Sequence, residues 1–397
     1  VIALTRMQRI LEVDAANRIA VVEPGVINLD ISKAVAEHGL YYVPDPSSQK
    51  ACSIGGNVAE NSGGPHCLAY GVTTNHVVAL EVALPDGQLV WLGDATGEEP
   101  GYDLRGVFIG SEGTLGIATK VVVRLAPAPE SVRTLLAIFN EMDDASATVS
   151  SVVAQGIVPA AVEMMDRLGI QAVENSLKAG YPLDAAAVLL LEVDGLNETV
   201  AEQLGALVEI CNRHHAREVR VAETAMDRER LWAGRKGALG AFGAIAPNYY
   251  ILDGVVPRSR LPEVLRRVGE IADGYGFPVA NIFHAGDGNL HPCILFDGNI
   301  TGAADRVLAA GAEIMRLCVD VGGSLSGEHG IGIEKQDFMA WVFSEDDMAV
   351  MRRLRPAFSA DDSFNPGKVF PGARGQHHGG ETGQRVMEQA LAAGAYI

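Results

Sequence analysis

The sequence has few cysteines, and none of them are spaced as C-x-x-C. The chain of 397 residues contains five, Cys52, Cys67, Cys211, Cys293 and Cys318. An odd number of cysteines without a close pair, in a chain of this length, argues against a disulfide framework and against a cysteine-bound iron–sulfur cluster. This usage predicts a reducing compartment, and we therefore expect a cytoplasmic protein.

Long apolar runs and positive charge are also scarce. No stretch reaches the roughly 18 consecutive apolar residues that a membrane-spanning helix needs. Lysine and arginine total 31 against 50 aspartate and glutamate residues, which gives a formal net charge of −19. Because nucleic acids and anionic membrane surfaces attract basic faces, this charge argues against both as partners. A small anionic substrate stays compatible with it, since one local arginine outweighs a distant field.

Two glycine-rich stretches match neither of the common phosphate-binding motifs. They are SIGGNVAENSGG at 53–64 and GSEGTLGIAT at 110–119. Neither fits the G-x-G-x-x-G pattern between a strand and a helix, and neither fits the P-loop. Their backbone N–H groups can still hold phosphates or a flat ring, because glycine permits close approach. By themselves the stretches are equally compatible with structural turns.

The pattern of the chain changes after APAPE at 126–130. Before it, short β-rich segments alternate with glycine-rich turns. After it, strands are expected at 133–139, 158–165, 186–195 and 217–222, and helices at 142–154 and 198–214. Two successive β-α-β patterns of this kind predict a sheet with helices on one face. The length of the chain predicts two or three domains.

The stretch HAGDGNLH at 284–291 places two histidines about an Asp-Gly turn signal. If Asp287 and Gly288 form a two-residue turn, His284 faces His291 across a β-hairpin, with Cβ atoms roughly 5 Å apart. Such a pair can supply two nitrogen ligands to one metal ion. The alternative is a pair of polar residues on an exposed sheet face.

A second cluster, GGSLSGEHGIGIEK at 322–335, contains Glu328 and His329 among glycines. A carboxylate and an imidazole held there can supply a third metal ligand and a base. With the histidine pair they predict a site of two histidines and one glutamate with open positions, which suits Zn²⁺, Mn²⁺ or Fe²⁺. Without the pair, an exposed acid on a flexible loop is the better interpretation.

The stretch RLWAGRKGAL at 230–239 offers three cations, Arg230, Arg235 and Lys236. An arginine fork binds a carboxylate through two hydrogen bonds. On a helix, Trp232 and Arg235 share a face because they lie three residues apart. A solvated basic helix face fits the same spacing, so the spacing does not choose among the three cations.

The motifs resemble, in their order along the chain, those of the FAD-linked 2-hydroxy-acid oxidases and dehydrogenases of the vanillyl-alcohol-oxidase type. They are CSIGGNVAENSGGPHCLAYG, GSEGTLGI, HAGDGNLHP, SGEHGIG and NPGK. The likeness extends from Val1 to about Pro371 and is strongest to the flavin subunits of bacterial glycolate oxidases, with D-lactate and D-2-hydroxyglutarate dehydrogenases as relatives. It implies metal-assisted oxidation of a small 2-hydroxy acid, glycolate or D-lactate, to the 2-oxo acid, with hydride transfer to FAD.

The resemblance implies an α+β fold, with a two-subdomain FAD-binding domain and an α/β cap domain whose sheet is largely antiparallel. We expect the FAD-binding domain at 1–128, the cap domain with the metal site at 129–344, a return to the FAD-binding domain at 345–371 and a loose tail at 372–397. The family carries a glycine-rich loop for the FAD pyrophosphate in a further N-terminal region. We expect that region to be missing here and FAD binding by this chain alone to be weak.

The resemblance also assigns roles to residues. Arg235 would hold the substrate carboxylate, and His329 would be the catalytic base. The metal ligands would be His284, His291 and Glu328. Cys293 stands where relatives that act on larger acids carry a polar group, which favours a small substrate. The FAD contacts would fall on Pro46, Ser47, Ser48, Gly55, Gly56, Asn57, Asn61, Gly63, Gly64, Glu112, Gly113, Gly116, Ile117, Asn365 and Lys368.

Glycolate oxidases of this type imply further flavin-type and iron–sulfur subunits, through which the chain would lie at the inner membrane. Two other interpretations fit parts of the sequence. A zinc hydrolase without flavin would use His284, His291 and Glu328 but would leave the glycine-rich stretches unexplained. A non-catalytic remnant would follow from loss of the cofactor loop.

Overall fold

The computed structural model describes residues 2–96 and 101–372, which form two compact units. The first unit contains the chain up to residue 128 and resumes at 328, and the second contains residues 129–327. The segment 328–344, which we expected within the cap domain, therefore belongs to the first unit. The expected loose tail at 372–397 lies outside the described residues except for residue 372 itself.

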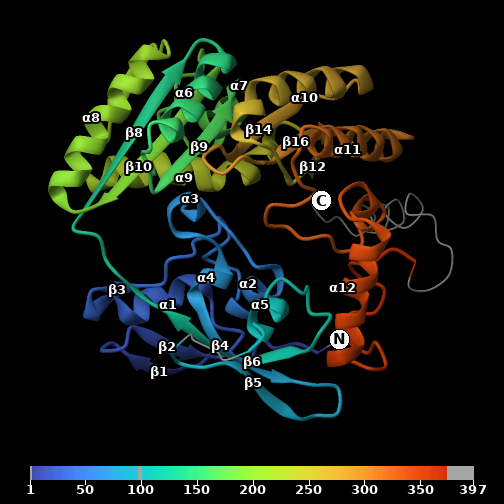
Figure 1. The fold of residues 1–397 in the computed structure, drawn as a ribbon. Coiled ribbons are helices and arrows are strands. Elements are labelled where there is room, and N and C mark those ends of the chain that lie inside the picture. Colours follow the sequence, from blue (N-terminus) through green and yellow to red (C-terminus); the bar gives the residue numbers. More distant parts are fainter. Residues whose placement is uncertain (1, 97–100, 373–397) are drawn as a thin grey trace. The chain divides into compact units, whose positions relative to one another are not determined.

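The first unit is built on an antiparallel sheet with the strand order β1-β2-β6-β4-β5 (Figure 1). The strands are β1 (Ile10–Asp14), β2 (Ile19–Val22), β4 (Val77–Ala83), β5 (Leu89–Gly93) and β6 (Ile117–Arg124), and β3 (Leu40–Tyr41) pairs separately with β7 (Ala126–Pro127). The helices are α1 (Asn28–Val35), α2 (Ile54–Glu60), α3 (Cys67–Tyr70), α4 (Thr73–His76), α5 (Leu104–Phe108), α12 (Glu345–Phe358) and the 3₁₀-helices Ala36–His38 and Gln336–Trp341.

Strand β4 lies between β6 and β5 in the sheet of the first unit, and its sequence VVALEVA is buried along nearly its whole length. Side chains of a strand alternate between the two faces. On one face Leu80 and Val82 pack with Ile31 of α1 and Ile54 of α2 in a single apolar cluster. The sheet therefore holds α2 and the glycine-rich segment around it in place.

The second unit contains an antiparallel sheet with the order β11-β8-β10-β9-β14-β15-β13, and β16 pairs with β14 and β12. The strands are β8 (Ser131–Phe139), β9 (Ala161–Asp166), β10 (Ala187–Gly195), β11 (Glu218–Val221), β12 (Asn248–Ile251), β13 (Gly254–Val255), β14 (Val279–His284), β15 (Asn289–Leu290) and β16 (Pro292–Phe296). The helices are α6 (Met142–Ala154), α7 (Arg167–Ser176), α8 (Asn197–Arg213), α9 (Ala225–Ala241), α10 (Leu261–Tyr275), α11 (Ala303–Asp320) and the 3₁₀-helices Phe242–Ala244 and Arg258–Arg260. The antiparallel pairing confirms the sheet that the resemblance implied.

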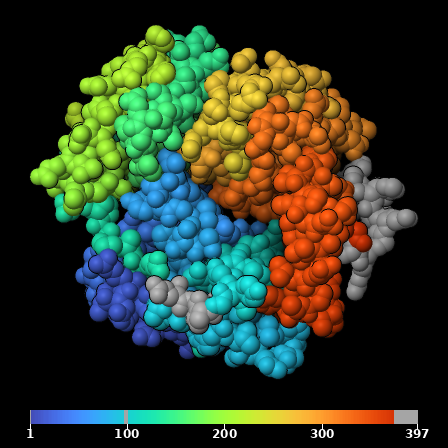
Figure 2. Space-filling view, in the orientation of Figure 1, coloured from blue at the N-terminus to red at the C-terminus, as the bar shows by residue number. Residues whose placement is uncertain are grey.

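Helices cover both faces of this sheet, which corrects the expectation of one helical layer. Helices α6 and α8 pack against β8 and β10, and the outer side of α8 is exposed (Figure 2, yellow-green). On the other face, Val188 and Ile282 pack with residues of α7 and α9 in one buried cluster. Met165 pairs with both Val188 and Ile282, so these residues share one face of the sheet. Glu163 and His284 each lie two residues along their strand from Met165 and Ile282, so their side chains also point towards α7 and α9.

A buried carboxylate fastens α9 to this face of the sheet. Glu192 of β10 is 1% exposed and accepts hydrogen bonds from Thr134 Oγ1 at 2.5 Å and Trp232 Nε1 at 2.6 Å. Arg228 donates to it from Nε at 2.8 Å and from Nη2 at 2.7 Å. These donors satisfy a charge that is otherwise costly to bury. Since Arg228 and Trp232 belong to α9, the carboxylate positions the helix that also carries Arg235.

Among the helices of the described residues, none combines the length and the apolar character that crossing a bilayer requires.

We expect Glu192→Gln to lower the free energy of unfolding by about 1–3 kcal/mol and with it the urea midpoint, because a neutral amide cannot accept from all the donors of Arg228, Trp232 and Thr134. Glu218→Gln is the matched control. It breaks an ion pair with Arg220 in which both side chains are nearly half exposed (46% and 44%). Exposed pairs of this kind contribute about 0–1 kcal/mol. Equal midpoints for the two variants would show that Glu192 does not anchor α9.

Candidate functional site

His284 and His291 come together in the second unit, but not through the two-residue turn that we expected. Strand β14 pairs with β15 so that His284 faces Asn289, and the turn spans the four residues 285–288. The predicted register was therefore wrong by two residues. Because a shift of two keeps the side chains on the same face, the histidine rings still approach, with centroids 5.2 Å apart.

The turn is wider than predicted because its backbone bonds outside the hairpin. The Gly286 N–H donates to Val162 O at 3.1 Å, and the Val256 N–H donates to Gly288 O at 3.0 Å. Gly288 has φ +79, and a Cβ there would lie 2.2 Å from Val256 O. The glycine is needed for this close approach of two backbones.

His284 is held by a residue that sequence reasoning missed. Its Nδ1 lies 2.8 Å from Oε1 of Glu163, which is 1% exposed and opposite His284 on β9. A carboxylate only accepts hydrogen bonds, so Nδ1 carries the proton and donates. A neutral imidazole that donates from Nδ1 has its lone pair on Nε2, the nitrogen suited to a metal.

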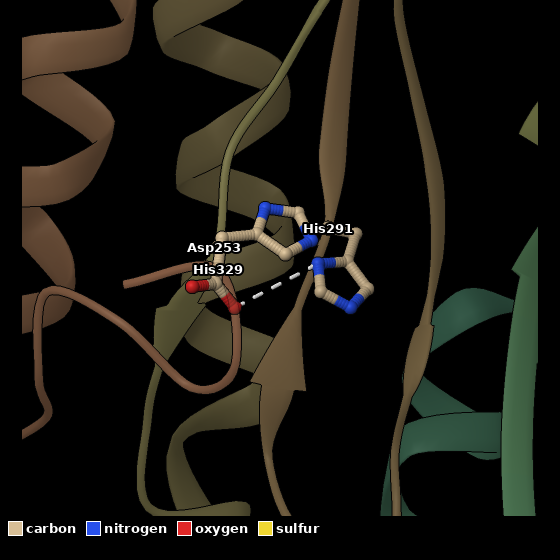
Figure 3. A group of neighbouring side chains, drawn as sticks. All are labelled: Asp253, His291 and His329. Atoms are coloured by element: carbon tan, nitrogen blue, oxygen red, sulfur yellow. Dashed lines mark ion pairs between the residues drawn. The ribbon is translucent and has the colours of Figure 1, made fainter. Parts of the chain in front are cut away.

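His291 is oriented in the same way by the backbone. Its Nδ1 lies 3.2 Å from the carbonyl oxygen of Leu252 and 4.0 Å from Oδ1 of Asp253 (Figure 3). Asp253 is fully buried and accepts from Ser326 Oγ at 2.6 Å and from the Gly327 N–H at 3.1 Å. Asp253 was also missed, because nothing in the local sequence marks it.

Arg235 lies beside this pair and shares Glu163 with it. The side chain of Arg235 is 5% exposed, and its Nη2 is 2.5 Å from Oε2 of Glu163. Its Nε is buried and has no hydrogen-bond partner among the residues that the structure describes. A buried guanidinium with an unsatisfied donor is the feature expected of a site that takes up a small anion.

The other two cations of the segment point elsewhere. Arg230 is exposed and lies 3.4 Å from Asp227. Lys236 stands over the ring of Trp232, with 5.7 Å from Nζ to the ring centroid. Of the three cations, the structure thus places only Arg235 beside the histidine pair, a choice that the sequence spacing could not make.

The first unit contains a large cavity, with a volume of about 940 Å³. This is near the upper end for small-molecule sites and suits a dinucleotide better than a small acid. Of the expected FAD contacts, those that line it are Gly55, Gly56, Gly113, Gly116, Ile117 and Asn365. Most of the exposed lining of this cavity is apolar, which suits a large ligand with apolar parts.

The remaining expected FAD contacts do not line this cavity, and some have packing roles. They are Pro46, Ser47, Ser48, Asn57, Asn61, Gly63, Gly64, Glu112 and Lys368. Asn57 is buried and accepts from Asn28 Nδ2 at 3.0 Å. A Cβ on Gly63 would lie 2.9 Å from Oε2 of Glu328, so this glycine makes room for that carboxylate.

Glu328 and His329 belong to the first unit, in a loop with two left-handed glycines, Gly330 at φ +83 and Gly332 at φ +56. The side chain of His329 is exposed. Glycine tolerates such φ values without the steric cost that other residues incur. The loop is therefore shaped by its glycines, as its sequence suggested.

Two family models match the chain. One is described as "FAD linked oxidases, C-terminal domain" and matches residues 128–369, and the other is described as "FAD binding domain" and matches residues 1–93. Among solved structures, the chain is similar to p-cresol methylhydroxylase with substrate bound, with a TM-score of 0.74 at 16% identity, over 92% of this chain and 78% of that one. At that identity the likeness concerns the fold alone.

Several proteins are similar in sequence over most of the chain. The glycolate oxidase subunit GlcD of Escherichia coli strain K12 is 47% identical over 386 residues, covering 95% of this chain and 77% of that protein. GlcD of Bacillus subtilis strain 168 is 40% identical, covering 93% of this chain and 79% of that protein. A D-lactate dehydrogenase of Anaerostipes hadrus is 34% identical, covering 93% and 79%.

The pKa of one carboxyl in the first unit is strongly perturbed. Burial and the negative charge of Glu112 raise the pKa of Glu60 to about 7, and Lys335 opposes the rise. The folded state thus favours the neutral carboxyl. Its contribution to stability is fully present below the ordinary glutamate pKa and is lost as pH rises through about 7.

We therefore expect Glu60→Gln, which is neutral at every pH, to raise the melting temperature of the first unit at about pH 8 and to leave it nearly unchanged at about pH 4. The exposed Glu12 of the same unit supplies the control, and Glu12→Gln should shift the melting temperature equally little at both values. Thermal melts at the two pH values decide the matter. A Glu60→Gln effect that does not depend on pH would contradict the raised pKa.

Proposed function

The chain belongs to the family of FAD-linked oxidases, and from that premise we propose that it oxidises a small 2-hydroxy acid, glycolate or D-lactate, to the 2-oxo acid. FAD is the cofactor of this family. The observation that carries the proposal is the buried Arg235 beside His284, with Glu163 shared between them. An anion site and an oriented imidazole at one place suit a substrate that has a carboxylate next to a hydroxyl.

Arg235 binds the substrate carboxylate in this proposal. Its guanidinium keeps one contact with Glu163 and turns its unsatisfied Nε to the substrate. In a buried site such a charge-assisted hydrogen bond is stronger than in water. Cys293 is fully buried on the same face, packed in the same cluster as Trp232, and the pKa of its thiol is raised by burial. An uncharged side chain at this position supports a small substrate.

His284 and His291 hold a divalent ion in this proposal, Zn²⁺, Mn²⁺ or Fe²⁺. Each ring has its Nδ1 beside an oxygen acceptor, which supports ligation through Nε2. Glu328 is the proposed third ligand. It follows Gly327 in the sequence. The Gly327 N–H donates to Asp253, and Asp253 lies next to His291. When bound, the ion supplies a positive charge that lowers the pKa of the substrate hydroxyl.

His329 accepts the hydroxyl proton in this proposal, a role that imidazole side chains commonly fill. FAD, when bound, supplies the acceptor for the hydride. Arg235 keeps the substrate in one orientation throughout, so that the carbon that loses hydride and the hydroxyl that loses its proton stay fixed.

Partner subunits are part of the proposal, because the relatives at 40–47% identity are named as subunits of glycolate oxidase. Further flavin-type and iron–sulfur subunits would accept the electrons and place the chain at the inner membrane. A zinc hydrolase is not favoured by any comparison, and the match to an FAD binding domain over residues 1–93 accounts for the glycine-rich stretch at 53–64 that a hydrolase leaves unexplained.

We expect His284→Ala and His291→Ala to abolish metal binding, because each ring supplies a ligand that its partner cannot replace. Glu163→Gln should weaken metal binding by about 10–100-fold, since it removes the carboxylate that orients His284. The control is His38→Ala, a partly exposed histidine of the first unit. Metal content after dialysis is measured by elemental analysis. Stoichiometric metal in either histidine variant would contradict the proposed ligands.

The function itself is tested with FAD supplied in excess, by anaerobic reduction of the flavin with glycolate and with D-lactate. We expect His329→Asn to keep flavin and metal but to slow the reduction by about 10²–10⁴-fold, because a general base is lost. The adjacent Glu328→Gln should instead lose metal. In the parent protein the rate should fall in acid, as the imidazole becomes protonated. A His329→Asn rate equal to the parent's, with the same acid limb, would show that the base lies elsewhere.

A further inference from the structure

The loop that carries His329 is held by one carboxylate of the first unit. The Ile331 N–H donates to Oε1 of Glu112 at 2.6 Å, and the Gly332 N–H donates to Oε2 at 2.7 Å. Both bonds run from neighbouring amides to the two oxygens of one anion, and charge-assisted bonds of this kind are stronger than neutral ones. The carboxylate thus fixes the backbone two residues beyond the imidazole.

Glu112 is itself held rigidly. Its backbone lies at φ +53, a conformation that costs energy for a residue other than glycine. The Glu112 N–H donates to Ala59 O at 2.8 Å, and Asn365 Nδ2 donates to the Glu112 carbonyl at 2.7 Å. Ser111 and Gly113, on either side of Glu112, line the large cavity. The same short loop therefore touches the cavity and the His329 loop.

The C-terminal segment of the unit closes this arrangement. The Val369 N–H donates to Gly332 O at 2.8 Å. Gln336 Nε2 donates to Gly332 O at 3.0 Å and to Gly367 O at 2.7 Å. Three segments that are distant in sequence thus meet around Glu112, and the two amides that it binds belong to the segment with His329.

We propose that Glu112 is a positioning residue that sets His329 relative to the large cavity of the first unit. The inference rests on the proposed role of His329 as the base. It reassigns a residue that the resemblance had placed among the FAD contacts, because its carboxylate is occupied by Ile331 and Gly332. Displacing a catalytic base by about 1 Å can slow the reaction by about 10²-fold. Hydrogen bonds that hold the loop of His329 in place therefore matter for the reaction.

Glu60 provides a matched control in the same cluster. A Cβ on Gly330 would lie 2.7 Å from both Glu112 Oε1 and Glu60 Oε2, so the two carboxylates flank the same loop. The Ile331 and Gly332 amides donate to Glu112 and not to Glu60. Glu112→Gln removes the carboxylate that binds both amides of the loop. Glu60→Gln alters a neighbouring carboxyl, whose raised pKa favours the neutral form, and leaves those two hydrogen bonds intact.

The experiment compares the flavin-loaded protein with Glu112→Gln, Glu112→Asp and Glu60→Gln. We expect Glu112→Gln to retain flavin, to lower the rate of flavin reduction by about 10–100-fold and to leave the KM nearly unchanged. Hydrogen exchange of the Ile331 and Gly332 amides should become faster. Glu112→Asp keeps the charge but is too short to reach both amides, so it should show the same changes to a smaller extent. Glu60→Gln should match the parent.

A double variant separates positioning from a general structural effect. If Glu112 acts through His329, Glu112→Gln should add little to the loss already caused by His329→Asn. Additive losses, unchanged amide exchange, or an equal loss in Glu60→Gln would overturn the inference. Loss of flavin from Glu112→Gln would return Glu112 to the FAD contacts. A His329→Asn variant with the parent's rate would instead defeat the proposed function, whatever Glu112 does.

Discussion

The carboxylate of Glu163, buried on the sheet of the second unit, holds the side chains of His284 and Arg235 in place. One oxygen faces Nδ1 of His284 at 2.8 Å and the other faces Nη2 of Arg235 at 2.5 Å. A buried carboxylate without a cation is costly, and a buried guanidinium without an anion is equally so. The ion pair of Glu163 with Arg235 therefore allows both charges to be buried. The same carboxylate also fixes the tautomer of the His284 imidazole.

The rest of the unit is arranged so that this pairing forms. Pairing of β14 with β9 places His284 opposite Glu163. Helix α9 must bring Arg235 to the same face, and Glu192 holds that helix through Arg228 and Trp232. Two carboxylates on one face of the sheet thus position one helix. The first unit uses the same device, since Glu112 holds the loop of His329 through two amides.

Local sequence was sufficient for several features. Helices α6 and α8 lie where the sequence predicted them. The spacing of apolar residues within a single segment is enough to indicate an amphipathic helix. Gly39 ends the first helical segment in a left-handed conformation, and the Asp-Gly pair at 86–87 turns β4 into β5. The order of the motifs was enough to indicate the family. Residue chemistry alone also indicated a pairing of His284 with His291, whose rings do approach each other.

Tertiary structure decided which residue partners which. The turn after His284 was predicted with two residues and has four, because its backbone bonds to Val162 and Val256, which the hairpin sequence does not contain. Glu163 lies 121 residues before His284, and Glu112 lies 219 residues before the first amide that it binds. No local pattern relates such positions, since strand pairing and chain return bring them together. By itself the sequence determined the kinds of side chain and their local elements, and only the packed chain decided which carboxylate orients which imidazole, because a buried charge takes whatever partner the fold brings within reach.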